Sequence, residues 1–207
     1  MTFAAVLSDL DGVLVDSGAD VERIWREWAV TQGLDPDDVG RNSHGVPGRQ
    51  VIERVAPHLD AEVESERLDA LHATTGGVAL PGAADLLATV SPLAVVTSCT
   101  PPLAAARFGG AGLTPPAVLI TADLTPRGKP FPDPYLAGAE ALGVPPGDCL
   151  VIEDAPAGIA AARAAGAGAV WAVTTTHDAS ELDADFIAAD VAGLLDRLRS
   201  RLPTPAR

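Results

Sequence analysis

The sequence has few cysteines and no long apolar run, and each shortage excludes a class of protein. Cys99 and Cys149 are the only cysteines among 207 residues, which is too few for a scaffold held together by disulfides. No stretch approaches the roughly 18 consecutive apolar residues of a membrane span, and no basic segment with an apolar stretch behind it marks a secretory signal. We therefore expect a protein of the reducing cytoplasm that does not cross a membrane.

Basic residues are also scarce. The chain holds 28 Asp and Glu against 14 Lys and Arg, which gives a formal net charge of −14. This charge repels the phosphates of nucleic acids and anionic lipid surfaces, so we expect neither nucleic acid nor membrane as a partner. The length and the 47% content of apolar residues predict a globular fold, either one domain or a domain with a sizeable insertion.

Short apolar runs that end in polar residues recur along most of the chain, as is typical of strands in a parallel sheet. Between them lie helical patterns, as at residues 83–90, 134–142 and 157–165. Alternation of strands and helices predicts an α/β fold, with a Rossmann-like parallel sheet covered by helices on both faces. The six predicted strands span residues 3–7, 93–96, 117–120, 149–152, 169–173 and 186–188.

Residues 17–79 break this alternation, because they show helical spacing and no convincing strand. One face of a first helix is formed by apolar residues at i, i+3, i+4 and i+7, namely Val21, Ile24, Trp25 and Trp28. Further helices are expected at residues 50–55 and 62–71. We predict a helical cap domain over residues 17–79, inserted into a core domain made of residues 1–16 and 80–207.

Two connectors join the predicted insertion to the core, near residues 16–18 and 76–82. Glycine occurs in both, and glycine allows backbone rotations that other residues resist. The connectors are therefore candidate hinges.

Polar side chains follow four of the predicted strands. Carboxyl ends of parallel strands meet at one edge of a sheet, where ligands bind. Carboxylates gathered there without a cation would repel and raise the pKa values of one another, and a divalent metal removes this repulsion. Oxygen ligands favour Mg²⁺. The residues brought to this edge are Asp9, Asp11, Thr97, Ser98, Glu153 and Asp154, with Lys129, the only lysine of the chain, in the loop after the third strand.

Four motifs contain these residues: DLDGVLVDS at 9–17, VVTS at 95–98, GKP at 128–130 and VIEDAPAG at 151–158. In order and spacing they closely resemble the motifs of the haloacid dehalogenase superfamily of phosphotransferases. The resemblance extends over about residues 3–195, and the helical insertion resembles the C1 cap that these enzymes carry after the first motif.

The resemblance implies a role for each core residue. Asp9 would be the nucleophile that attacks phosphorus and forms an aspartyl-phosphate. Asp11 would protonate the leaving alcohol and then deprotonate the attacking water. Thr97 and the backbone N–H of Ser98 would hold phosphate oxygens, and Lys129 would neutralise charge between the nucleophile and the phosphoryl group.

The resemblance also implies the ligands of the metal. Asp9, the backbone carbonyl of Asp11, and Asp154 would bind Mg²⁺. Glu153 would be either a further ligand or a close neighbour of the ligands.

In the cap we name His44, Gly45 and Arg49 as candidate substrate-binding residues. His44 and Gly45 lie in the loop before the second expected cap helix, where members of the family commonly point specificity residues at the core, and Arg49 is an alternative anion contact. For Trp25 and Trp28 core packing is the favoured interpretation.

Within the superfamily the chain most resembles bacterial sugar- and hexitol-phosphate phosphatases and yeast phosphatases of 2-deoxyglucose 6-phosphate or glycerol phosphate. The stretches that carry this likeness include residues 21–28, 43–45 and 128–136. The sequence departs from these phosphatases at Ser8, where an aromatic residue is common, and at Val13, where Thr is usual. The predicted activity is hydrolysis of a small phosphorylated metabolite by a monomer or weak homodimer.

Three alternatives remain open. The first motif of β-phosphoglucomutase also tends to have Val at the position of Val13, but that enzyme typically has His where this chain has Val21 and a basic, polar loop where it has Pro47 and Gly48. A phosphoglycolate phosphatase would carry the same type of cap. A catalytically inactive phosphosugar-binding module is the weakest alternative, because every motif position holds a chemically competent side chain.

Overall fold

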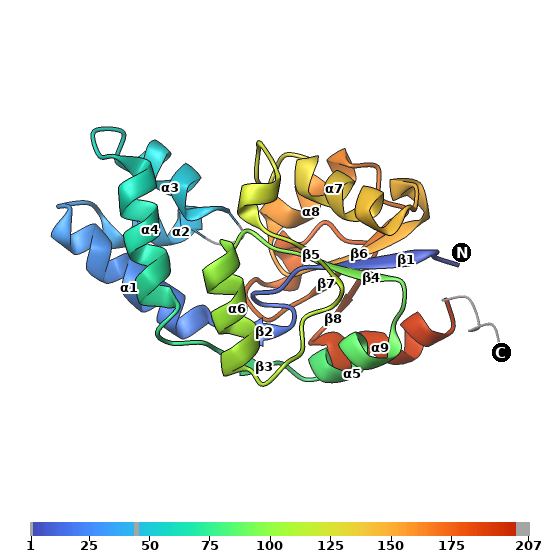
Figure 1. The fold of residues 1–207 in the computed structure, drawn as a ribbon. Coiled ribbons are helices and arrows are strands. Elements are labelled where there is room, and N and C mark those ends of the chain that lie inside the picture. Colours follow the sequence, from blue (N-terminus) through green and yellow to red (C-terminus); the bar gives the residue numbers. More distant parts are fainter. Residues whose placement is uncertain (1, 44–45, 202–207) are drawn as a thin grey trace.

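A computed structural model of the protein describes residues 2–43 and 46–201. Its centre is a six-stranded sheet, with all neighbouring strands parallel, in the order β5-β4-β1-β6-β7-β8 (Figure 1). This confirms the predicted α/β fold, and each strand coincides with a predicted run to within two residues at either end. The strands are β1 (Ala5–Ser8), β4 (Leu93–Val96), β5 (Val118–Ile120), β6 (Cys149–Glu153), β7 (Ala169–Val173) and β8 (Phe186–Ala188).

Helices cover both faces of the sheet (Figure 1). Successive residues of a strand point to opposite faces, so Val6 packs into an apolar cluster with α5, α6 and α9, whereas Leu7 packs into a second cluster with α7 and α8. The chain returns from each strand through one of these helices or through a short 3₁₀ turn. The helices are α5 (Ala83–Thr89), α6 (Pro101–Gly110), α7 (Asp133–Leu142), α8 (Pro156–Ala164) and α9 (Val191–Arg199), and the turns are η1 (Ala122–Leu124), η2 (Pro146–Asp148) and η3 (Ala179–Glu181).

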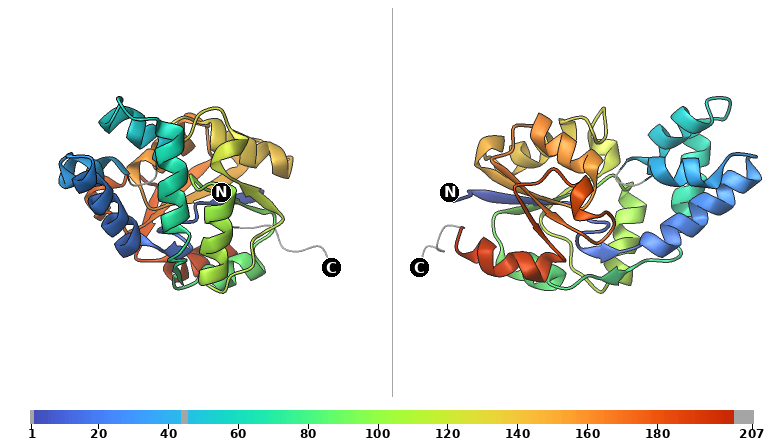
Figure 2. Two further views of the ribbon diagram at one scale, coloured as in Figure 1. Left: turned by 60° about the vertical axis from the view of Figure 1, so that its left-hand side comes forward. Right: turned by 180° about the vertical axis from the view of Figure 1, so that it is seen from behind.

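Four further helices stand together beyond one end of the sheet (Figure 1), and the view from behind in Figure 2 shows the same separation. They have an apolar cluster of their own, in which the rings of Trp25 and Trp28 pack edge to face with centroids 5.4 Å apart. Trp28 Nε1 also donates a hydrogen bond of 2.8 Å to Glu64 Oε2. The helices are α1 (Gly18–Thr31), α2 (Pro36–Ser43), α3 (Gly48–Val55) and α4 (Ala61–His72).

The two connectors between these helices and the sheet pair with each other. β2 (Val15–Asp16) and β3 (Val78–Ala79) form an antiparallel ribbon in which Val15 lies opposite Ala79. A side chain at Gly77 is excluded, because its Cβ would lie 2.4 Å from Val15 Cγ1 and its φ is +146°. The ribbon was not predicted, since strands of two residues leave no periodic pattern.

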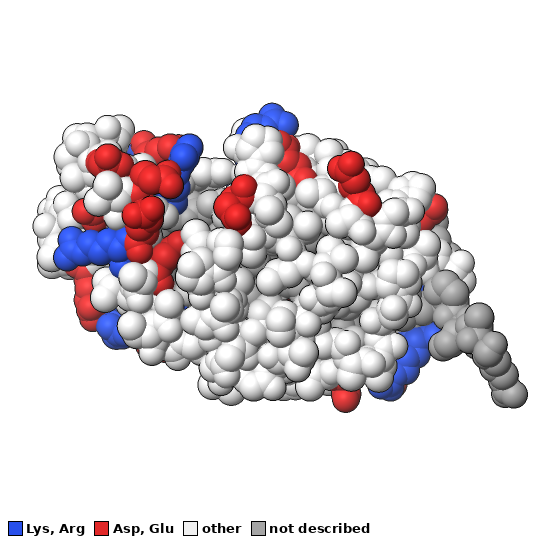
Figure 3. Space-filling view, viewed as in Figure 1, with Lys and Arg blue, Asp and Glu red and all other residues white. Residues whose placement is uncertain are grey.

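Charged side chains are unevenly distributed over the surface. Figure 3 shows them gathered over the helices α1–α4, with acidic residues predominating, whereas the face of the sheet domain in this view carries few. Among the described residues, no helix has the length and apolar character needed to cross a bilayer.

Candidate active site

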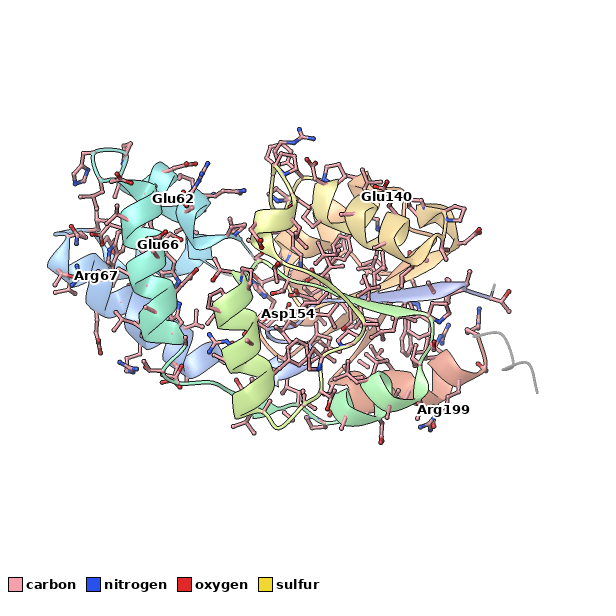
Figure 4. All side chains as sticks on the ribbon, viewed as in Figure 1. Glu62, Glu66, Arg67, Glu140, Asp154 and Arg199 are labelled. Carbon is pink, nitrogen blue, oxygen red and sulfur yellow. The ribbon has the colours of Figure 1, made fainter. Side chains whose placement is uncertain are left out.

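The polar residues that were predicted to meet at one edge of the sheet do meet there. Asp9 follows β1 directly and its N–H donates to the carbonyl of Ile152 at 2.9 Å, which ties the first motif to β6. Thr97 follows β4, and its Oγ1 accepts a hydrogen bond of 3.1 Å from the N–H of Cys99 in the turn before α6. Asp154 lies at the end of the sheet that faces the helices α1–α4 (Figure 4). The residues that directly follow three separate strands thus lie together at one edge of the sheet.

Lys129 is the cation at the centre of this group. Its side chain is 1% exposed, and its Nζ lies 2.8 Å from Asp9 Oδ1 and 2.6 Å from Glu153 Oε1. Burial by itself would lower the pKa of Lys129, but the two carboxylates raise it above its ordinary value. The ammonium is therefore fully protonated at neutral pH and offsets part of the negative charge around it.

Glu153 is held by donors on both of its oxygens. Besides Lys129, the hydroxyl of Tyr135 donates to Oε1 at 2.5 Å, and the N–H groups of Asp154 and Ala155 donate to Oε2 at 3.0 and 3.3 Å. Gly158 lets α8 approach, since a Cβ there would lie 1.7 Å from Glu153 Oε1. Glu153 thus fixes Lys129 and the start of α8, and its oxygens have little capacity left for another ligand.

Asp9, Glu153 and Asp154 form a buried acidic cluster in which one oxygen from each residue lies within 4.8 Å of the others. Burial raises the pKa of Asp9 to about 7, against the opposing charge of Lys129. Burial, together with the negative charges of Glu153 and Asp9, also raises the pKa of Asp154 well above its usual range. One ammonium does not balance three carboxylates, and a set of oxygen ligands suits a hard divalent cation. The cluster could therefore bind a metal.

Asp154 is oriented by neighbours that the motifs did not reveal. Thr176 Oγ1 donates to Asp154 Oδ2 at 2.5 Å, and Thr175 Oγ1 donates to the carbonyl of Gly12. Gly12 has φ +79°, and a Cβ there would lie 2.0 Å from Asp154 Oδ2. The loop after β7 and the left-handed turn at Gly12 therefore hold Asp154 from two sides.

Asp11 has surroundings of its own. Its Oδ1 accepts hydrogen bonds from Arg107 Nε at 2.9 Å and from Ser17 Oγ at 2.5 Å, and its Oδ2 accepts one from Cys99 Sγ at 2.9 Å. Burial raises the pKa of the Cys99 thiol well above its usual value, so Cys99 keeps its proton and donates it. The carboxylate of Asp11 does not belong to the acidic cluster of described residues.

A cavity of about 230 Å³ lies between this group and the cap. Its core side is lined by Asp9, Asp11, Thr97, Ser98 and Asp154. Its other side is lined by the apolar residues Val21 and Trp25 of α1 and by the polar residues Asp69 and His72 of α4. Asp9, Asp11 and Thr97 therefore face a space in which a small molecule can be held, whereas Lys129 lies behind Asp9 and does not line it. Trp25 serves the cap cluster and the cavity wall at once.

Of the three candidate substrate-binding residues of the predicted cap, the structure describes only Arg49. His44 and Gly45 lie outside the described residues. Arg49 is 58% exposed and pairs at 3.1 Å with both Glu53 and Glu62, the latter on α4 (Figure 4). It lines a second cavity, of about 390 Å³, which adjoins the first and shares Gly48, Asp69 and Ser98 with it. A role for Arg49 in substrate binding stays a prediction.

Comparison with known proteins gives one consistent picture. The profile of the haloacid dehalogenase-like hydrolases matches residues 3–166. The chain is 44% identical over 186 residues to hexitol phosphatase A of Escherichia coli K12, with 86% of each chain covered. It is 33% identical over 199 residues to glycerol-1-phosphate phosphohydrolase 2 of Saccharomyces cerevisiae, covering 88% of this chain and 77% of that protein.

A solved structure of a hydrolase from Pseudomonas syringae superposes with a TM-score of 0.82 at 27% identity, over 96% of this chain and 98% of the other. The profile match includes all four motifs that bring Asp9, Thr97, Lys129 and Asp154 together. The chain belongs to the haloacid dehalogenase-like hydrolases.

Proposed function

We propose that this protein is a Mg²⁺-dependent phosphatase that hydrolyses a small sugar or polyol phosphate through an aspartyl-phosphate. The observation that carries the proposal is the buried ammonium of Lys129, held 2.8 Å from Asp9 beside a cavity of small-molecule size. A phosphate ester and a carboxylate repel each other unless cations stand between them. The activities named for the bacterial and yeast relatives support the substrate class.

In the first half of the reaction, an oxygen of Asp9 attacks phosphorus, and the bond between phosphorus and the leaving oxygen breaks. Asp11 gives its proton to that oxygen, so the alcohol leaves neutral. Thr97 Oγ1 and the N–H of Ser98 donate to the phosphate oxygens. Lys129 offsets the charge that develops between the nucleophile and the phosphoryl group.

In the second half, Asp11 takes a proton from a water molecule, whose oxygen attacks the phosphorus of the aspartyl-phosphate. The bond to Asp9 breaks, inorganic phosphate leaves, and both aspartates return to their starting states. One residue serves as acid and then as base, which requires a carboxyl at the cavity wall that is not bound up in the acidic cluster. The position of Asp11 meets this requirement.

Asp9, the carbonyl of Asp11, and Asp154 would hold the metal, because Glu153 already accepts two hydrogen bonds on each oxygen. When bound, Mg²⁺ supplies the positive charge that lets the phosphate approach the carboxylates. We assign Glu153 to the positioning of Lys129 and α8 and not to the metal.

Residues 17–79 form the cap in this proposal, and the ribbon of β2 and β3 is the pair of strands on which it moves. The small volume of the cavity supports a small phosphorylated metabolite as the substrate. We further propose that the enzyme works in the cytoplasm as a monomer or weak homodimer.

The test is a panel of phosphate esters incubated with the protein and Mg²⁺: hexitol phosphates, glycerol 1-phosphate, 2-deoxyglucose 6-phosphate, phosphoglycolate and glucose 1-phosphate. We expect release of inorganic phosphate from a sugar or polyol phosphate. Asp9→Asn should abolish that release and leave the circular dichroism spectrum unchanged. Asp196→Asn is the matched control, because the Asp196 side chain is 98% exposed. Conversion of glucose 1-phosphate to glucose 6-phosphate without phosphate release would contradict the proposal.

A further inference from the structure

Arg107 is a buried cation that the four motifs do not include. It lies on α6, and its side chain is 1% exposed. Its Nε donates to Asp11 Oδ1 at 2.9 Å, and its Nη1 donates to the carbonyls of Gly76 at 2.6 Å and His72 at 3.3 Å. One guanidinium therefore binds the carboxylate of Asp11 and the backbone that leads out of the cap.

The chain comes close to α6 at this point because two glycines meet. A Cβ on Gly76 would lie 3.0 Å from the Cα of Gly110, and a Cβ on Gly110 would lie 2.7 Å from the Cα of Gly76. With any side chain at either position the connector would stand further from α6, and the Gly76 carbonyl would be out of reach of Arg107. The hydrogen bond from Arg107 to Gly76 therefore depends on the position of this connector.

Packing alone does not account for a guanidinium here. Removal of a charge from water is costly and is offset only by well-placed partners. Among the described residues, the carboxylate that forms an ion pair with Arg107 is that of Asp11, whose side chain is 32% exposed and lines the cavity. The negative charge of Asp69, which also lines the cavity, acts on Arg107 at longer range. The two carbonyls add partial negative charge, and His72 is the last residue of α4, where the helix dipole favours a cation. All of its partners are thus on the cavity wall or on the segment that leaves the cap.

We infer that Arg107 is a positioning residue that orients the carboxyl of Asp11 for proton transfer to the leaving oxygen and links that orientation to the connector at Gly76. The inference rests on the proposed function. Arg107 itself exchanges no proton, because a guanidinium stays charged throughout. The proton passes from Asp11 to the leaving oxygen as the bond to phosphorus breaks, and Arg107 fixes the direction from which it is offered.

The leaving group distinguishes this role from a structural one. The alcohol of a polyol phosphate leaves poorly without a proton, whereas the nitrophenolate of p-nitrophenyl phosphate is a stable anion that needs little help. In the first half of the reaction, a residue that acts through Asp11 should therefore matter for the first substrate much more than for the second. General acids commonly contribute about 10²- to 10⁴-fold to a rate, so a misdirected Asp11 should cost on the order of tenfold or more on the alkyl ester alone.

The experiment compares kcat and KM of Arg107→Met, Asp11→Asn and the double variant on glycerol 1-phosphate and p-nitrophenyl phosphate. We expect Arg107→Met to lower kcat/KM on glycerol 1-phosphate at least about tenfold more than on p-nitrophenyl phosphate. The comparison uses kcat/KM because water attack on the aspartyl-phosphate, in which Asp11 is the base, contributes to kcat for both esters alike. It should change that ratio no further when Asp11 is already Asn. Arg107→Lys should restore part of the ratio. The control is Arg163→Met, since Arg163 on α8 also pairs with an aspartate, Asp185, at 2.9 Å, but is 37% exposed and lies outside the cavity lining.

Equal losses of kcat/KM on both substrates, or additive effects on kcat/KM in the double variant, would overturn the inference and leave the proposed function intact. If the wild-type protein hydrolyses another polyol phosphate of the panel but not glycerol 1-phosphate, that ester takes the place of glycerol 1-phosphate. A wild-type protein that releases phosphate from no ester of the panel would refute the proposed function and the inference with it. If circular dichroism shows Arg107→Met to be unfolded, Arg107→Gln carries the same comparison, because it keeps an amide donor but no charge.

Discussion

The ionisation of Asp9 should contribute, with that of Asp154 in the same direction, to how the metal-free protein responds to pH. The Asp9 side chain is 6% exposed, and burial raises its pKa from 3.8 to about 7 in spite of Lys129. Below the folded pKa, the native carboxyl keeps a proton that the unfolded chain has already lost. Above it, the native state holds a buried charge that the unfolded chain holds in water. The metal-free protein therefore becomes less stable as the pH rises from about 4 through 7.

A shift of about 3 pKa units corresponds to about 4 kcal/mol at 1.4 kcal/mol per unit. Asp9→Asn removes the charge and keeps both the volume and an acceptor for Lys129. We therefore expect this variant, in EDTA at about pH 8, to be more stable than the wild type by up to about 4 kcal/mol. The gain is reduced because Lys129 then has one carboxylate partner, Glu153, in place of two. The difference should shrink as the pH falls toward 5, where Asp9 is protonated in the native state.

Urea unfolding followed by tryptophan fluorescence at pH 5, 6, 7 and 8 measures this difference. Millimolar Mg²⁺ should stabilise the wild type and should stabilise Asp9→Asn much less, because binding to the native state shifts unfolding by mass action. Asp196→Asn should show neither effect. The reasoning is wrong if Asp9→Asn is the less stable protein at pH 8 in EDTA, or if the difference does not change with pH.

Three further predictions concern the same region. Burial, helped by the charge of Arg107, lowers the pKa of His72 from 6.5 to about 4, so the native state resists protonation and loses up to about 3 kcal/mol of stability as the pH falls from 6.5 to 4. In urea titrations, His72→Leu should not lose this stability at acid pH. The same loss in His72→Leu as in the wild type would contradict the assignment. Lys129→Met should lower phosphate release at least about 100-fold and cost about 3 to 5 kcal/mol in urea unfolding, and because Lys129 is 1% exposed we expect Lys129→Arg not to restore activity. Gly12→Ala should abolish Mg²⁺-dependent stabilisation, since its Cβ would lie 2.0 Å from Asp154 Oδ2, whereas Gly112→Ala, with φ +64° and no atom within 4 Å, should cost only the left-handed backbone penalty of about 1 kcal/mol.

The sequence by itself was enough to place Asp9, the lysine and the acidic pair at one edge of a parallel sheet. Asp9, Thr97 and Asp154 follow apolar runs whose carboxyl ends must meet when the strands pair in parallel, so their proximity follows from the pattern. Lys129 was identified as the only lysine, in a motif between two such runs. The helical character of the insertion was likewise visible, because apolar residues repeat with the period of a helix.

Only the tertiary structure decided which further groups hold these residues in place. Arg107 meets Asp11 across 96 positions of the chain, and Thr176 meets Asp154 across 22. Such contacts depend on how a helix or loop docks onto the sheet, and docking leaves no periodic signal in the sequence. The contact of α6 with the Gly76 connector requires glycine at both Gly76 and Gly110. The reason for glycine at these positions is visible only once the two backbones are seen to touch. The motif residues were thus set by local pattern, and their orientation by long-range packing.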